Sequence, residues 1–96
     1  MKITFSYAAT QNFEAAVRFI RSDSPKNAEK FAVEILKKIE ELSSDPARYP
    51  PDKFKRNNDG SYRAFEIHHY RVAYRISPSE IRVIRFRHTS LEPSDH

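Results

Sequence analysis

A short break between two helical stripes constrains the fold of this chain more than any other sequence feature. Both stripes have the spacing of a helix face that packs on a core: Phe13, Ala16, Val17 and Ile20 in the first, and Ala28, Phe31, Ala32, Ile35, Ile39 and Leu42 in the second. Between them, Ser24 suits an N-cap and Pro25 suits the first helical position. The second helix should end at about Ser43, before Pro46. So short a link predicts an antiparallel helical hairpin.

The segments on either side of the hairpin have the period of β-strands. Residues 2–7 alternate between polar and apolar side chains, which predicts a short strand with Ile3, Phe5 and Tyr7 on its buried side. Three more strands are predicted later in the chain: residues 62–68, 70–77 and 80–88. The sequence does not decide which side of the last strand faces the core, because each side combines apolar residues with cations. A central, a twisted and a bulged strand all fit this pattern.

Regular alternation assigns a facing to the other two late strands. It places one apolar set on the buried side: Phe65, Ile67, Val72, Tyr74 and Ile76. It turns Arg71, Ala73 and Arg75 outward, together with Glu66 of the preceding strand. The sheet face away from the helices is therefore the expected working surface.

Residues 44–61 predict a long, irregular and basic loop. They contain three prolines, the only glycine (Gly60) and the basic run of residues 53–56. The resulting order is β-α-α-β-β-β. It predicts one α+β domain over residues 1–96, with the helical hairpin packed on a small, mainly antiparallel sheet.

Length and composition exclude several classes of protein. Ninety-six residues, of which 39% are hydrophobic and 31% charged, suit one globular domain with a modest core. No apolar run approaches the roughly 20 residues of a transmembrane helix, and residues 1–7 do not have the pattern of a signal peptide. With no cysteine and four scattered histidines, we expect a cytoplasmic protein without disulfide, metal site or cofactor.

The positive charge is concentrated in the second half of the chain. Residues 1–52 hold eight basic and eight acidic side chains, whereas residues 53–88 hold nine basic and three acidic ones. A clustered excess of this kind indicates an acidic partner, either nucleic acid or an acidic protein surface. Solubility alone is an equally good explanation of the excess.

Three stretches resemble one known family. DSPKNAEKFAVEILKKIEELSSDPARYP is similar to the second helix of RelE/ParE superfamily toxins, the toxic halves of type II toxin–antitoxin (plasmid stabilisation) modules. YRVAYRI looks like their Tyr-Arg strand motif, and IRVIRFRHTSLEP is similar to their last strand and its exit. No single motif is very specific for this family. Their order and spacing, which extend over nearly the whole chain, are specific together.

The resemblance implies one of two activities. RelE-like members cleave mRNA on the ribosome, whereas ParE-like members inhibit DNA gyrase by binding and need no catalytic residue. His88, Ser90, Leu91 and Glu92 resemble the His-x-Ser-Met-Asp exit of the ParE branch, and residues 62–66 lack the Lys-x-Lys pair of RelE-like toxins. We therefore expect a ParE-like gyrase poison. A ribosome-dependent mRNA endonuclease is the first alternative, and a non-toxic basic nucleic-acid-binding module is the second.

The two activities need different site residues. Cleaving RNA through its 2′-OH requires proton transfer and cations beside the phosphate. The candidate cations are Arg63, Arg71, Arg75 and Arg87, and the candidates for proton transfer are His88 and His68. The resemblance favours Arg71 and His88, with Glu66 or Tyr62 assisting. Tyr62 or Tyr70 would stack on a base. The residues expected to contact nucleic acid or another target are Lys53, Lys55, Arg56, Tyr62, Arg63, Arg75 and Arg87.

Each assignment also has a structural alternative. Arg71 and Arg75 would pair with Glu66 across the sheet if they form a structural ladder. His88 would fix the strand exit or contact an antitoxin, and the cations of residues 53–56 would simply be solvated. His68 and His69 suit a tight turn better than a metal site.

The resemblance also implies partners. A cognate antitoxin should form a heteromeric assembly with the toxin. An acidic and apolar segment that folds on binding would cover the positive surface, as a helix or strand laid against the helices or a sheet edge. The other partner is DNA gyrase, or the ribosome and mRNA in the alternative, and no membrane partner is expected.

Overall fold

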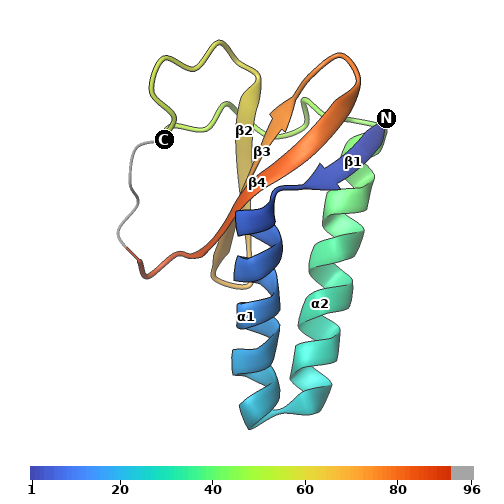
Figure 1. The fold of residues 1–96 in the computed structure, drawn as a ribbon, viewed down its shortest axis with the longest axis vertical. Coiled ribbons are helices and arrows are strands. Elements are labelled where there is room, and N and C mark those ends of the chain that lie inside the picture. Colours follow the sequence, from blue (N-terminus) through green and yellow to red (C-terminus); the bar gives the residue numbers. More distant parts are fainter. Residues whose placement is uncertain (92–96) are drawn as a thin grey trace.

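The computed structural model describes residues 1–91 and shows two helices packed against one four-stranded sheet (Figure 1). The elements along the chain are β1 Lys2–Phe5, α1 Tyr7–Asp23, α2 Pro25–Glu40, a 3-10 turn Glu41–Ser43, β2 Tyr62–Ile67, β3 Tyr70–Ile76 and β4 Glu80–His88. The predicted β-α-α-β-β-β order, α+β class and end of the second helical segment are confirmed.

Two serines set where the helices begin. The Ser6 hydroxyl accepts a hydrogen bond from the Ala9 backbone N–H at 3.0 Å, and Ser24 does the same for Asn27 at 3.2 Å. Ser24 also donates its own N–H to the Ile20 carbonyl at 2.8 Å, so one residue ends α1 and caps α2. The result is the predicted antiparallel hairpin, seen in the lower half of Figure 1.

The prediction that Tyr7 lies on the buried side of the first strand is wrong. β1 ends at Phe5, and Tyr7 begins α1 with 80% of its surface exposed. The cause is the cap between them: Ser6 has an extended backbone and binds the first turn of the helix, so the chain changes direction there.

The sheet order is β1-β4-β3-β2, so the first strand pairs with the last. β1 runs parallel to β4, and the other two pairings are antiparallel. The prediction of a mainly antiparallel sheet is therefore confirmed. One sheet face and the hairpin enclose the core, whose largest members include Phe31, Ile35, Leu42, Phe65, Val72, Tyr74, Ile81, Val83 and Phe86. We call the opposite side of the sheet the open face; no helix of residues 1–91 covers it.

A β-bulge interrupts β4. Ala73 of β3 lies opposite Arg85, but the next residue, Tyr74, lies opposite Val83. Ile84 is therefore an extra residue in β4, without a counterpart in β3. The strand is thus both central and bulged, two of the possibilities that the sequence left open.

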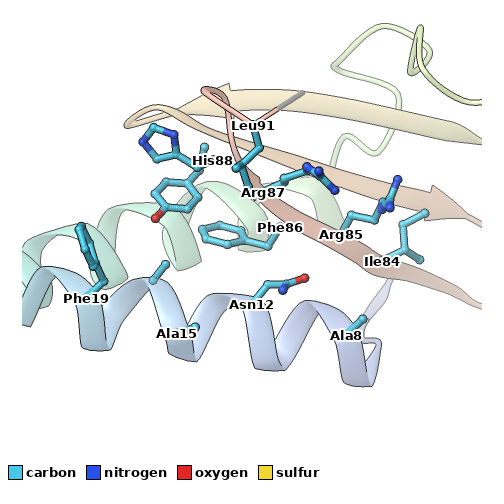
Figure 2. Close-up of a pocket in the computed structure, with 12 residues that line it drawn as sticks. Ala8, Asn12, Ala15, Phe19, Ile84, Arg85, Phe86, Arg87, His88 and Leu91 are labelled. Atoms are coloured by element: carbon cyan, nitrogen blue, oxygen red, sulfur yellow. The ribbon is translucent and has the colours of Figure 1, made fainter. Parts of the chain in front are cut away.

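The bulge settles the facing of β4. Val83 and Phe86 are both buried in the core although they are three residues apart. Arg82, Arg85 and Arg87 accordingly project from the open face. Figure 2 shows Arg85 and Arg87 pointing away from α1, while Phe86 points toward it.

Residues 44–61 run beside β2 and over part of the open face. Pro51 forms a β-bridge with Arg63, and the Asp52 N–H donates to the Tyr62 carbonyl at 2.8 Å. Ala73 is directed outward as predicted, yet it is only 3% exposed, so longer neighbouring groups lie over it. The loop is irregular in shape but attached to the sheet.

Tyr74 joins this loop to the core, which makes a test of the packing possible. Its hydroxyl, on a fully buried residue, donates to the Pro46 carbonyl at 2.8 Å. Tyr74→Phe should lower the free energy of unfolding by about 1–2 kcal/mol, because the Pro46 carbonyl loses its donor. Urea unfolding measures this, with Tyr7→Phe at an exposed position as the control.

The same variant tests a pH effect. Burial raises the pKa of Tyr74 to about 12, above the ordinary value of 10. The unfolded chain therefore ionises first, and stability should decline as the pH rises from about 10 to about 12. Tyr74→Phe should remove most of this decline, and an unchanged decline in the variant would contradict the assignment.

Candidate functional site

Five arginines of β3 and β4 lie on the open face. We call them the arginine face: Arg71, Arg75, Arg82, Arg85 and Arg87. The strand register places Arg75 opposite Arg82 and Arg71 opposite Arg87, with Arg85 in the row between. Cations of neighbouring strands therefore lie side by side across the middle of the sheet.

A buried ion pair fixes Arg71. Its Nη2 lies 2.8 Å from the carboxylate of Asp52, whose side chain is 1% exposed. Its Nη1 lies 3.1 Å from the carboxylate of Glu66, the residue opposite it on β2. The guanidinium also lies 4.8 Å from the ring centre of Phe54. Both terminal nitrogens of Arg71 are thus bound to carboxylates.

Asp52 also organises the loop around it. Its carboxylate accepts a hydrogen bond from the Phe54 N–H at 3.0 Å. The Asn58 amide donates to the carbonyls of both Asp52, at 3.3 Å, and Tyr62, at 2.8 Å. These bonds hold the basic run of the loop against the sheet, with its cations Lys53, Lys55 and Arg56.

Cations lie against both aromatic rings of this region. The Lys55 ammonium is 4.6 Å and the Arg75 guanidinium 5.1 Å from the ring centre of Tyr62. The Lys53 ammonium is 5.2 Å from the ring centre of Phe54, and Arg71 also lies against this ring. The two rings therefore help to place cations.

The three predicted catalytic residues border one small pocket. Glu66, Arg71 and His88 line a cavity of about 120 Å³ together with Arg87. Glu66 and Arg71 reach it from the open face. His88, however, lies opposite Tyr70 in the ladder, and Tyr70 is on the helix side of the sheet.

His88 is held by contacts on that side. Its ring meets the Tyr70 ring edge-on, with centroids 5.0 Å apart. Its Nδ1 accepts a hydrogen bond from the Ser90 N–H at 3.0 Å and lies 2.6 Å from the Ser90 hydroxyl. Tyr70 in turn stacks on Phe86 at 4.8 Å, and its burial raises the pKa of its phenol. These contacts fix the exit of β4.

Arg63 lies apart from the other predicted binding residues. Its guanidinium donates to the carbonyls of Tyr49, at 2.6 Å, and Gly60, at 3.1 Å. It therefore ties two parts of the 44–61 loop to β2. Gly60 has a φ of +96°, a conformation that glycine adopts without the strain of a side chain.

His68 and His69 form the turn between β2 and β3. Both have positive φ, 52° and 66°, as tight hairpin turns require. His68 Nε2 is hydrogen-bonded to the Glu34 carboxylate on α2, which links this turn to the helical hairpin. Within residues 1–91, no three His, Asp or Glu side chains gather as metal ligands, and no helix is long and apolar enough to cross a membrane.

A groove lies between α1 and the edge of β4 (Figure 2). β1 accompanies β4 only as far as Val83, so the rest of that edge faces α1. The groove has a volume of about 450 Å³ and is lined by apolar residues and cations, among them Ala15, Phe19, Arg85, Arg87 and Leu91. Phe19 and Leu91 are 76% and 52% exposed, large values for apolar side chains.

Comparison with known proteins identifies the family. The family model described as ParE toxin of type II toxin-antitoxin system, parDE, matches residues 3–92. The chain belongs to the ParE toxin family. This membership confirms the resemblance to RelE/ParE superfamily toxins and implies a cognate antitoxin as partner. No curated protein sequence matches this ParE-family chain significantly.

Two solved structures share the fold. A chain of the chromosomal ParDE TA system from P. aeruginosa superposes with a TM-score of 0.70 at 14% identity, covering 92% of this chain and 95% of that one. The YoeB/ParE toxin from Agrobacterium tumefaciens superposes with a TM-score of 0.60 at 22% identity, covering 92% of this chain and 98% of that one. At such identities the likeness extends to the fold alone.

Three residues of the site are not evident from the sequence of this ParE-family toxin. Arg82 and Arg85 share a face only because of the bulge, which simple alternation does not reveal. In the sequence Asp52 is an ordinary acidic residue of a loop. Its position between Pro51 and the basic run is only a weak signal of a structural role. Of the predicted exit motif, Glu92 lies outside the described residues.

The ion pair gives a direct test. Asp52→Asn should lower the free energy of unfolding by about 3 kcal/mol, because it removes the buried partner of Arg71. Glu66→Gln is the matched control: its side chain is 56% exposed, so the loss should stay below about 1 kcal/mol. Urea unfolding compares the two, and equal losses would show that Asp52 has no special role.

Proposed function

We propose that this ParE-family protein is a toxin that stops growth in the cytoplasm by binding and poisoning DNA gyrase, without catalysis of its own. One observation carries the proposal: Arg71, the cation that a ribonuclease would use, is bound to both Asp52 and Glu66. To serve a scissile phosphate, Arg71 would have to leave a buried carboxylate, which costs about 3 kcal/mol or more.

The placement of the other two groups supports binding as well. Proton transfer requires a group within about 3 Å of the proton that moves. Glu66 is engaged by Arg71, and the His88 ring packs against Tyr70 on the helix side of the sheet. The three side chains therefore favour a binding surface over a catalytic centre.

The second candidate function is a ribosome-dependent mRNA endonuclease. The pocket of about 120 Å³ supports it, because Glu66, Arg71, Arg87 and His88 all line that cavity. An RNA substrate would have to displace a carboxylate from Arg71 and turn His88 away from Tyr70. Gyrase binding needs neither change, which is why we prefer it.

The groove beside α1 offers a site for the antitoxin. An acidic and apolar segment that folds on binding would place its apolar residues on Phe19 and Leu91. Its acidic residues would meet Arg85 and Arg87 at the same groove. The edge of β4 beyond Val83, which β1 does not accompany, would allow the segment to add as a strand.

Induced expression separates the two candidate functions. Cells expressing the chain should show gyrase-linked DNA breaks and a DNA-damage response, while transcript ends on translating ribosomes stay unchanged. Codon-phased mRNA cuts with normal plasmid supercoiling would instead establish the endonuclease. His88→Gln sharpens the comparison: an endonuclease that loses its proton donor should lose about 100-fold or more of its activity, whereas a gyrase binder should stay toxic. His69→Gln, in the neighbouring turn, is the control.

A matched pair of variants tests the antitoxin groove. Phe19→Glu should weaken binding of the cognate antitoxin by about tenfold or more, as loss of a central interface side chain does. Val33→Glu, 59% exposed on α2 and away from the groove, should bind normally. Isothermal titration with the purified antitoxin gives both values. Equal affinities would place the antitoxin elsewhere.

A further inference from the structure

We infer that this toxin forms a homodimer in which α2 packs antiparallel on α2 of a second copy, with the two-fold axis beside Val33. The contact uses the side of the helical hairpin that is turned away from the sheet. It involves neither the arginine face nor the groove beside β4, so the inference goes beyond the proposed function and does not depend on it.

The centre of this surface is apolar although it is exposed. Val33 and Leu36 are 59% and 43% exposed and lie on one side of α2. A hollow of about 340 Å³ adjoins them, and the residues of the range 1–91 that line it all belong to the two helices, among them Phe13, Val17 and Ala32. It therefore opens away from the sheet. We call these five residues and the hollow the hairpin back.

The charges of α2 are arranged symmetrically about Val33, with opposite signs. Glu29 and Lys37 lie four residues to either side of it, and Lys26 and Glu40 lie seven residues to either side. All five residues are exposed, and their spacing of three or four keeps them in one stripe of the helix. If a second α2 lies antiparallel with Val33 against Val33, each acid of the stripe faces a cation of the other copy. A parallel arrangement would instead place like charges together.

The same arrangement brings an apolar side chain to the hollow. A two-fold axis perpendicular to α2 keeps α1 of both copies on the same side, so the four helices stack in two layers. Leu36 of one copy is then level with residue 30 of the other copy, on the side where α1 runs. There it meets the hollow beside Ala32. Each copy supplies one projecting side chain and one hollow, as an isologous interface requires.

The balance of charge favours a second copy over other partners. The stripe carries two acids and two cations, so it attracts neither a strongly acidic nor a strongly basic surface. An acidic antitoxin segment would meet Glu29 and Glu40 there. Only a partner with the mirrored pattern satisfies every charge, and another copy of α2 has that pattern.

The size of the hairpin back predicts a weak dimer. α2 has 16 residues, so it is about 24 Å long, and two helices side by side (Figure 1) are about 20 Å wide. Two copies would therefore bury about 1,000 Å² in total, which is at the low end for specific interfaces. We expect a dissociation constant on the order of 10 µM. The exposed ion pairs add little to this affinity, but they fix the orientation.

Sedimentation velocity on the purified toxin, from about 1 to about 200 µM, tests the association. The mass should rise with concentration from 11.3 kDa toward twice that value. Val33→Glu places two carboxylates at the axis and should raise the dissociation constant about tenfold or more. Phe19→Glu, on the groove side of α1, is the matched control and should associate like the wild type. Circular dichroism confirms that each variant is folded.

A charge exchange tests the antiparallel register. Glu29→Lys places like charges against Lys37 of the second copy, twice by symmetry, and should weaken the dimer about fivefold. Glu29→Lys combined with Lys37→Glu restores opposite signs and should recover the wild-type dissociation constant. Within one chain the two positions are about 12 Å apart along the helix, so the recovery reports a contact between copies.

A mass of 11.3 kDa at every concentration would overturn the inference, as would unchanged association of Val33→Glu. A double variant as weak as Glu29→Lys would rule out the antiparallel register. Isothermal titration with the antitoxin identifies the other occupant: if Val33→Glu lost affinity while the wild type stayed monomeric, the antitoxin would cover the hairpin back instead. A dimer that leaves gyrase uninhibited would overturn only the proposed function.

Discussion

A single extra residue in β4 decides what this molecule can present to a partner. With regular alternation, Arg85 and Arg87 would follow Val83 into the core, and Phe86 would face solvent. Burying two arginines without partners would cost more than a short strand gains by pairing. The bulge at Ile84 removes this conflict, so one strand supplies both apolar contacts to the helices and cations to the open face. Fold and binding surface depend on the same irregularity.

The acidic residues near this surface have a complementary role. Cations placed close together repel one another, and a loop carrying three more would be driven away from them. Asp52 counteracts this by pairing with Arg71 from inside the loop, while its backbone holds β2. The same pair withdraws Arg71 from solvent. The surface is therefore basic but ordered, and the arginine at one end of it is committed to structure.

Local signals in the sequence were sufficient for the fold but not for the site. Ser24 and Pro25 mark the hairpin because capping depends only on neighbouring residues. Regular alternation puts Arg71 and Glu66 on one face, so their pairing is one of the structural alternatives that the sequence predicts. The sequence leaves a bulge open as one possibility, but the position of the bulge and the partner of Asp52 do not follow from it, because each depends on residues far apart in the chain. The wrong prediction for Tyr7 has a different cause. Alternation extends the first strand to Tyr7, whereas an N-cap at Ser6 starts a helix there, and the structure has the cap.

The pairing of β1 with β4 has a consequence for the order of events during synthesis. Ile3 lies beside Ile81, so the first strand made has its partner only in the last strand described. The hairpin can form early from local contacts, but the sheet cannot close until residue 88 is available. The arginine face therefore forms only after the helical hairpin. A ribosome that has made the hairpin but not yet β3 and β4 carries a β1 without its partner strand and presents no arginine face.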